Sequence, residues 1–267
     1  MTETTGTEIK SIESKAIAYL KRDDVMNKFK EVLWKNANTF VSTLLSIVSQ
    51  NELLKNADPI SIYMSALMSA WLGLPINPNL WFAYILPYHS KDKWQVAQFQ
   101  MWYKWFIQLA QRSWQFKTIS ASKVFKWQLV EENPLTWYEF DRTKKESEEV
   151  IWYAWYFKLL NWFEKTIYMS VKELEEHWMK FSQTFKRGFW LWKTDFDAMA
   201  IKTVIKALLS KYAPLSVDMQ TAVEKDQAVI YDENHFEYED NDEKAITEID
   251  LDEKMQNVKP LDNDKLL

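Results

Sequence analysis

The side chains best suited to chemistry in this chain are basic and amide groups on one predicted helix. Lys104, Gln108, Gln111 and Arg112 follow one another at the spacing i, i+4, i+7 and i+8, so they share one helical face. The opposite face of the same helix is apolar and is expected to pack on a sheet. Donors and cations gathered on one face suit a polyanion such as the phosphate backbone of a nucleic acid.

Further basic and amide residues are candidates for the same surface. They come from the strands before and after that helix, from a polar loop and from the final long helix. Each alone is typical of a solvated surface residue, but part of the set converges on one groove if the elements pack as predicted. The candidate nucleic-acid-binding residues are Lys104, Arg112, Lys117, Lys123, Lys186, Arg187, Lys193, Lys202, Lys206, Gln98 and Gln100.

Signatures of enzymes are largely missing. The chain has no GxxxxGK[ST] motif, only 3 glycines and no cysteine, and its 3 histidines show no metal-ligand spacing. Asp195 and Asp197 are the best acidic pair, and a nuclease could use such carboxylates to hold a metal ion. Capping of the helix that follows is the simpler interpretation. We therefore predict no ATP use, no cofactor, no metal site and no enzymatic activity.

The elements that must position these residues alternate between helices and hairpins, which predicts an α+β fold with a mostly antiparallel sheet packed with helices. Strands are predicted at 82–88, 96–101, 116–125 and 138–141, and a hairpin at 150–160 and 163–169. Helices are predicted within 24–50 with a break near 36–38, from Asp58 and Pro59 to about Trp71, after the capping box of Ser170 and Glu173, and from Asp195 to about Tyr212.

Charge divides the chain into a basic body and an acidic end. The whole chain carries a net charge of −5, but residues 224–267 hold 15 acidic and 5 basic residues. We predict a flexible arm at 1–22, a core for DNA binding and oligomerisation at 23–223, and a disordered acidic tail at 224–267. The tail could provide solubility, dock a partner or mimic DNA. With no apolar run long enough for a membrane span and no signal-peptide pattern, we expect a cytoplasmic location in a bacterial host cell.

Tryptophan is unusually frequent, with 15 Trp against 3 Gly. Trp94 and Trp162 fall in predicted turns, where positive φ angles favour glycine. We interpret many of these residues as tryptophan at positions whose backbone favours glycine, and the alternative is a surface on which bases stack. The positions concerned are 81, 94, 102, 105, 114, 127, 137, 152, 155, 162, 178 and 190.

Several motifs in order along the chain carry a family resemblance. LGLPINPNL (72–80), YILPY (84–88), AQFQ (97–100), IQLAQRS (107–113) and TDFDAMAIKTVIK (194–206) resemble the RecT/Redβ family of phage single-strand annealing proteins over roughly residues 29–223. In that family glycine is general where this chain has Trp102, Trp105 and Trp114.

The resemblance implies a recombination protein that binds single-stranded DNA and anneals complementary strands without ATP, as an oligomeric ring or filament. It also implies annealed duplex DNA, a companion exonuclease and a host single-strand binding protein as partners. The helices before residue 72 are candidates for subunit contacts. Two alternatives remain at this point: a metal-dependent nuclease, and an oligomeric scaffold or adaptor that does not bind DNA.

Overall fold

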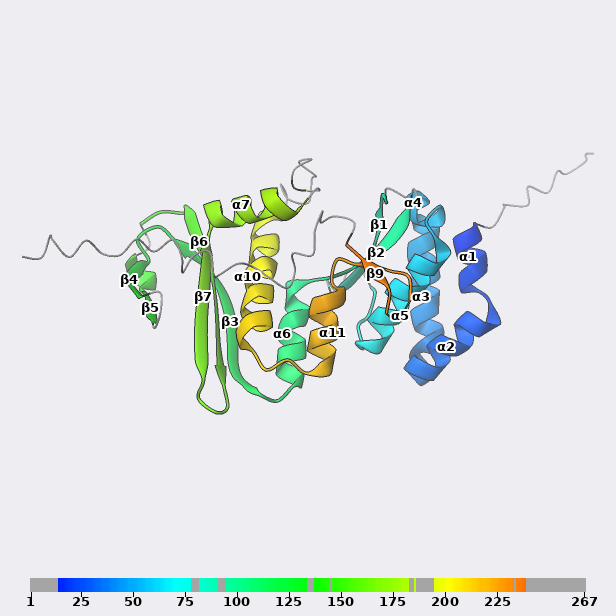
Figure 1. Ribbon diagram of the computed structural model, residues 1–267, viewed down its shortest axis with the longest axis horizontal. Helices are drawn as coiled ribbons and strands as arrows, with labels where there is room; N and C mark the ends of the chain where they lie inside the picture. The colour runs from blue at the N-terminus through cyan, green and yellow to red at the C-terminus, as the bar shows by residue number, and fades with distance from the viewer. Residues whose placement is uncertain are drawn as a thin grey trace, which may run out of the picture. The chain divides into compact units, whose positions relative to one another are not determined.

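The protein folds into two units, each containing helices and antiparallel strands (Figure 1). The computed structural model describes residues 14–77, 82–90, 95–133, 137–144, 146–182, 185, 195–232 and 234–238. Unit 1 comprises residues 1–108 and 225–239, and unit 2 comprises residues 109–224 and 240–267. The α+β class predicted from the sequence is confirmed.

Unit 1 packs the N-terminal helices on a two-stranded antiparallel sheet, in which Ala83 lies opposite Met101 and Tyr88 opposite Val96. Its strands β1 and β2 agree closely with the predicted ones. The helix predicted between 24 and 50 is broken by a 3₁₀ turn, as the sequence indicated. The elements are α1 (Lys15–Leu20), α2 (Asp23–Leu33), η1 (Trp34–Asn36), α3 (Ala37–Gln50), α4 (Glu52–Lys55), α5 (Pro59–Trp71), β1 (Ala83–Tyr88), β2 (Val96–Met101), β8 (Val229–Ile230) and β9 (Phe236–Glu237).

Helix α5 forms the core of unit 1. It begins as predicted, with Asp58 as N-cap and Pro59 at the first helical position. Two of its serines bind the neighbouring strand: Ser61 Oγ accepts from the N–H of Ala97 at 2.8 Å, and Ser65 Oγ donates to the Ala97 carbonyl at 3.3 Å. Nearly every residue from 61 to 70 is buried. The middle of α5 is therefore interior. The prediction that this helix provides subunit contacts is corrected for these buried residues.

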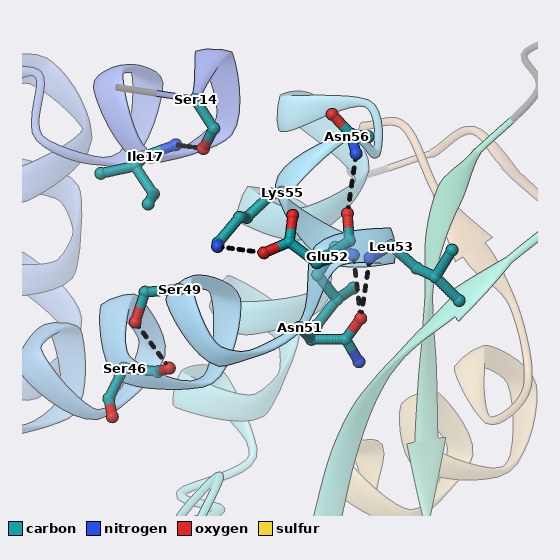
Figure 2. A network of polar contacts seen from close by, with 10 residues as sticks. Ser14, Ile17, Ser46, Ser49, Asn51, Glu52, Leu53, Lys55 and Asn56 are labelled. Carbon is teal, nitrogen blue, oxygen red and sulfur yellow. Dashed lines mark hydrogen bonds and ion pairs between the residues drawn. The ribbon is translucent and has the colours of Figure 1, made fainter. Parts of the chain in front are cut away.

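Short helices of unit 1 are held by side-chain caps (Figure 2). Ser14 Oγ accepts from the N–H of Ile17 at 3.3 Å at the start of α1. Asn51 Oδ1 accepts from the N–H groups of Leu53 and Leu54 at 3.0 and 3.2 Å at the start of α4. These caps satisfy backbone donors that have no partner inside a helix, so helices of only 6 and 4 residues can form.

Unit 2 is built on a three-stranded antiparallel sheet in the order β3-β6-β7, with a separate β4-β5 hairpin. Helix α6 (Tyr103–Arg112) connects the chain of the two units. The elements that follow it are β3 (Phe116–Phe125), β4 (Leu129–Asn133), β5 (Trp137–Phe140), η3 (Arg142–Lys144), β6 (Val150–Leu159), β7 (Glu164–Ser170), α7 (Val171–Phe181), α10 (Phe196–Tyr212) and α11 (Val217–Lys225).

Helix α10 covers one face of this sheet (Figure 1). The alternate residues Tyr153, Trp155 and Phe157 of β6 are 0–1% exposed, as expected for a strand with one face on a core. The indole Nε1 of Trp155 donates to the Ile201 carbonyl of α10 at 2.9 Å. The predicted hairpin of β6 and β7 and the capping box of Ser170 and Glu173 are both present.

Ordered structure extends past both ends of the predicted core. Helix α1 lies inside the segment predicted as a flexible arm, and the predicted acidic tail contributes residues 227–230 that lie against β2. Backbone hydrogen bonds join Phe99 to Gln227 and Ala228 at 2.8 and 3.0 Å. Residues beyond 238 lie outside the described part of the chain. Strand β4 is a further element that the sequence pattern did not indicate.

Tryptophan occupies most of the non-glycine positions with a positive φ in the described residues. They are Trp34, Trp114, Trp127 and Trp162, at φ 51°, 55°, 71° and 71°, and Gln227. The glycine interpretation is confirmed for 114, 127 and 162, and Trp34 joins them. Trp102, Trp105, Trp137, Trp152, Trp155 and Trp178 are not among the positive-φ positions, so for them the interpretation stays a prediction. Positions 81, 94 and 190 lie outside the described residues.

Replacing Trp162 by glycine should stabilise the fold. Trp162 is 67% exposed and sits in the β6–β7 turn at φ 71°, so glycine removes backbone strain of about 1 kcal/mol without opening the core. Denaturant unfolding of Trp162→Gly measures the gain, and Trp162→Ala, which keeps a Cβ, should not show it. The mass of the proteolytic peptide that contains residue 162, taken from the protein as its own cells make it, would show directly whether glycine stands at this position.

Candidate nucleic-acid interface

The polar face predicted for residues 104–112 is present on α6. Lys104, Gln111 and Arg112 are exposed, whereas Phe106 and Leu109 on the opposite face are 1% and 2% exposed. The strong amphipathic pattern of this helix therefore turns its two cations outward. An exposed face carrying Lys and Arg can contact phosphates without reading base edges.

The two glutamines predicted for the same groove are used inside unit 1. Gln98 and Gln100 are 6% and 7% exposed on β2. The amide Nε2 of Gln98 donates to the Gln227 carbonyl at 2.7 Å. This contact helps to fix the returning segment after α11, so the placement of Gln98 in an open groove is corrected.

Lys123 belongs to a polar cluster where β3, β6 and α10 meet. The Asp197 carboxylate accepts from the Lys123 ammonium and from the Tyr153 hydroxyl, the latter at 2.5 Å. Partial burial raises the pKa of Asp197, but the bonds from Lys123 and Tyr153 outweigh it and leave the pKa below its ordinary value. Burial and the same carboxylate raise the pKa of Tyr153. Asp195 is the N-cap residue of α10 and Asp197 lies in its first turn, as predicted, although the Asp195 side chain makes no capping hydrogen bond.

Lys202 and Lys206 lie one turn apart on α10, as predicted, but their side chains are only 3% and 8% exposed. Lys206 and Lys180 also act on His177 of α7. Burial, followed by the positive charges of Lys180 and Lys206, lowers the pKa of His177 to about 4. Lys202 and Lys206 lie in the interior of unit 2, so their contact with a phosphate stays a prediction that their burial does not favour.

The predicted single groove draws on both units. Lys104, Gln98 and Gln100 belong to unit 1, whereas Arg112, Lys117, Lys123, Lys202 and Lys206 belong to unit 2. Lys186, Arg187 and Lys193 lie outside the described residues. The structure joins Lys123 to Asp197 and leaves Lys104, Arg112 and Lys117 exposed. Convergence of the whole set stays a prediction.

Three lysines outside the predicted set lie with Lys117 in two pairs, Lys117 and Lys158 over the ring of Trp162, and Lys165 and Lys211 over the ring of Tyr212. Lys158 and Lys165 are on the hairpin, and Lys211 is in the last turn of α10. A turn centred on Asn161 and Trp162 sets the register that pairs Lys158 with Glu164. The sequence could therefore have indicated the positions of Lys158 and Lys165 on the hairpin. The position of Lys211 depends on how α10 packs, which no local pattern specifies.

Within the described ranges, no group of three or more His, Cys, Asp or Glu residues could hold a metal ion. The helices described there are also too short or too polar to cross a membrane.

Comparison with known proteins identifies the class of protein to which this interface belongs. The profile of the RecT family matches residues 38–250. The chain belongs to the RecT family. It is 46% identical over 205 residues to the uncharacterized protein YqaK of Bacillus subtilis (strain 168), covering 76% of this chain and 69% of YqaK. It is 27% identical over 184 residues to Protein RecT of Escherichia coli (strain K12), covering 65% of each chain.

RecT family membership confirms the resemblance carried by the sequence motifs and assigns the chain to the single-strand annealing proteins of DNA recombination. The matched range includes all of unit 2 that the structure describes, as well as α5, β1 and β2 of unit 1. The exposed face of α6 and the cluster around Asp197 therefore lie within the RecT part of the chain. The matches span about two thirds of the length of both relatives.

Removing the Asp197 carboxylate should destabilise the protein. Asp197→Ala leaves the Tyr153 hydroxyl without its acceptor, which costs about 1–3 kcal/mol of unfolding free energy. Tyr153→Phe is the matched variant. Because both changes remove the same hydrogen bond, the double variant should lose less than the sum of the two single losses in a denaturant-based cycle. Strict additivity would show that the two groups are not coupled.

The unfolding free energy should also fall in acid, because the pKa of His177 is lowered in the folded protein. Its pKa is about 4 in the folded protein against an ordinary value of 6.5. Between these values the unfolded chain binds a proton that the folded chain does not, so the unfolding free energy falls by up to ~1.4 kcal/mol per pH unit as the pH drops. The contribution is fully present above 6.5. His177→Gln should flatten this part of the pH profile relative to wild type, and an unchanged profile would contradict it.

Proposed function

We propose that this RecT family protein binds single-stranded DNA and anneals complementary strands without ATP, as a homo-oligomer in the form of a ring or filament. The observation that carries the proposal is the exposed face of α6, on which Lys104 and Arg112 lie on a helix whose other side is buried. Cations of this kind hold the sugar-phosphate backbone and leave the base edges free to find a partner.

Base pairing supplies the driving force for annealing, so the reaction needs no hydrolysis and no catalytic residue. Each subunit offers only a few exposed cations, and an oligomer would align many such sites along one strand. The combined effective concentration would then offset the weak binding of each site. Annealed duplex DNA, a companion exonuclease and a host single-strand binding protein are the further partners that this function would require.

The nuclease alternative is not favoured by the geometry. Its best candidate ligand, Asp197, is already held by Lys123 and Tyr153. The scaffold alternative is separated from ours by a direct test. Incubation of the protein with two complementary labelled oligonucleotides, without nucleotide, should speed duplex formation, and the scaffold alternative predicts neither binding nor acceleration.

Charge reversal on α6 should weaken DNA binding in a salt-dependent way. Lys104→Glu and Arg112→Glu each remove one cation near the backbone, so the slope of log affinity against log salt should decrease by about one for each phosphate that is no longer bound. The loss of affinity should be larger at low salt than at high salt. Fluorescence anisotropy with a single-stranded oligonucleotide measures it. Lys172→Glu, an exposed lysine of α7 paired with Glu176 at 3.8 Å, is the control.

A further inference from the structure

The β4-β5 hairpin of unit 2 stands apart from the rest of that unit. Figure 1 shows it beyond the β3-β6-β7 sheet, on the side away from α10. Within the described residues, no other helix or strand packs substantially on β4 or β5. A two-stranded hairpin without further packing is marginally stable at best in water. Contact with another molecule would supply the packing that the described part of the chain does not.

The base of the hairpin is held by hydrogen bonds. Gln128, just before β4, is 8% exposed, and its side-chain Oε1 accepts from the N–H of Phe125 at 2.9 Å. The Gln128 carbonyl accepts from the N–H of Asp141, just after β5, at 2.8 Å. Val130, at a register shift between the two strands, is 46% exposed. The hairpin therefore leaves the end of β3 as an arm with a fixed base and an exposed apolar residue beside it.

This arm is acidic. Residues 129–141 contain 4 acidic residues and no basic ones, namely Glu131, Glu132, Glu139 and Asp141. The strand register places Glu131 opposite Glu139, and like charges at directly opposed positions destabilise a pair of strands. An arm of this charge repels a nucleic acid, whereas a basic protein surface would offset the repulsion between its own strands. The charge and the register together indicate a basic protein surface as the partner.

The N-terminal helices of unit 1 carry the opposite charge. Residues 15–35, which cover α1, α2 and most of η1, hold 6 basic and 3 acidic residues. Two of the acidic residues, Asp24 and Glu31, are already paired with cations of the same segment, at 2.8 and 3.3 Å. Lys30 and Lys35 are exposed. The segment as a whole therefore attracts an acidic partner.

We propose that the β4-β5 arm of one copy of this chain docks on the N-terminal helices of a second copy. The contact joins unit 2 of one copy to unit 1 of the next, so it is head-to-tail. Head-to-tail contacts generate rings when the rotation between copies closes and filaments when it does not. The contact also leaves the exposed face of α6 to DNA. The proposal rests on the proposed homo-oligomer and assigns the two surfaces that hold its subunits together.

The first test removes charge from the arm without loosening it. Glu131→Gln with Glu139→Gln ends the repulsion between the strands, so the midpoint of thermal unfolding should not fall, whereas self-association should weaken by about tenfold at low salt. The difference should shrink at high salt, which screens exposed charges. Sedimentation velocity with and without a thymidine homopolymer measures assembly. Glu175→Gln with Glu176→Gln, two exposed residues of α7 in the same unit, is the matched control and should assemble as wild type does.

The second test exchanges the charges between two variants. Glu131→Lys, Glu132→Lys and Glu139→Lys together make the arm basic, and Lys30→Glu with Lys35→Glu makes the helices acidic. In each variant alone the arm and the helices have the same sign, so self-association should be at least about tenfold weaker than in wild type at low salt. In an equimolar mixture every arm meets helices of opposite charge on a copy of the other variant. The mixture should therefore assemble, which also shows that both variants are folded.

The outcomes separate the two levels of inference. If wild type does not self-associate with or without DNA, the proposed homo-oligomer falls and the arm contact falls with it. If wild type assembles and the arm variants assemble equally well, only the arm contact is overturned. A mixture that assembles no better than its separate components overturns the pairing of the arm with the N-terminal helices. Loss of assembly in the helix variant alone, with the arm variants unaffected, overturns it as well.

Discussion

Unit 2 depends on the packing of α10 against the inner face of β6. Tyr153, Trp155 and Phe157 supply large buried side chains on that face, and their burial is the main source of stability available to a sheet of only three strands. Two polar contacts set the position of the helix: the Trp155 indole on the Ile201 carbonyl, and the Tyr153 hydroxyl on Asp197. Since buried donors must find acceptors, these contacts exclude other registers of α10 on the sheet.

The position of α10 in turn decides which cations face solvent. Its inner side buries Lys202 and Lys206, whereas Lys211 in the last turn is exposed beside the ring of Tyr212. Lys123 is held at the other end by Asp197. The packing of this one helix therefore decides which of these lysines lie in the interior of unit 2 and which lie at its surface.

Unit 1 depends in a similar way on β2, which is buried along its whole length. One edge of β2 pairs with β1, and the other receives the segment after α11. Asp226, 0% exposed, accepts from the N–H of Met101 at 2.7 Å. An acidic residue from a highly charged part of the chain thus satisfies a buried backbone donor, which a count of charges would not indicate.

Sequence by itself determined the elements whose signals are local. The polar face of α6 follows from periodicity, the start of α5 from Asp58 and Pro59, and the hairpin from the turn at Asn161 and Trp162. The motif order also determined the RecT family. Only the tertiary structure decided that Gln98 holds the returning segment, that Asp197 binds Lys123 and Tyr153, and that Lys202 and Lys206 are buried. Those contacts join residues far apart in sequence, so they depend on packing between elements, which the local spacing of residue types does not specify.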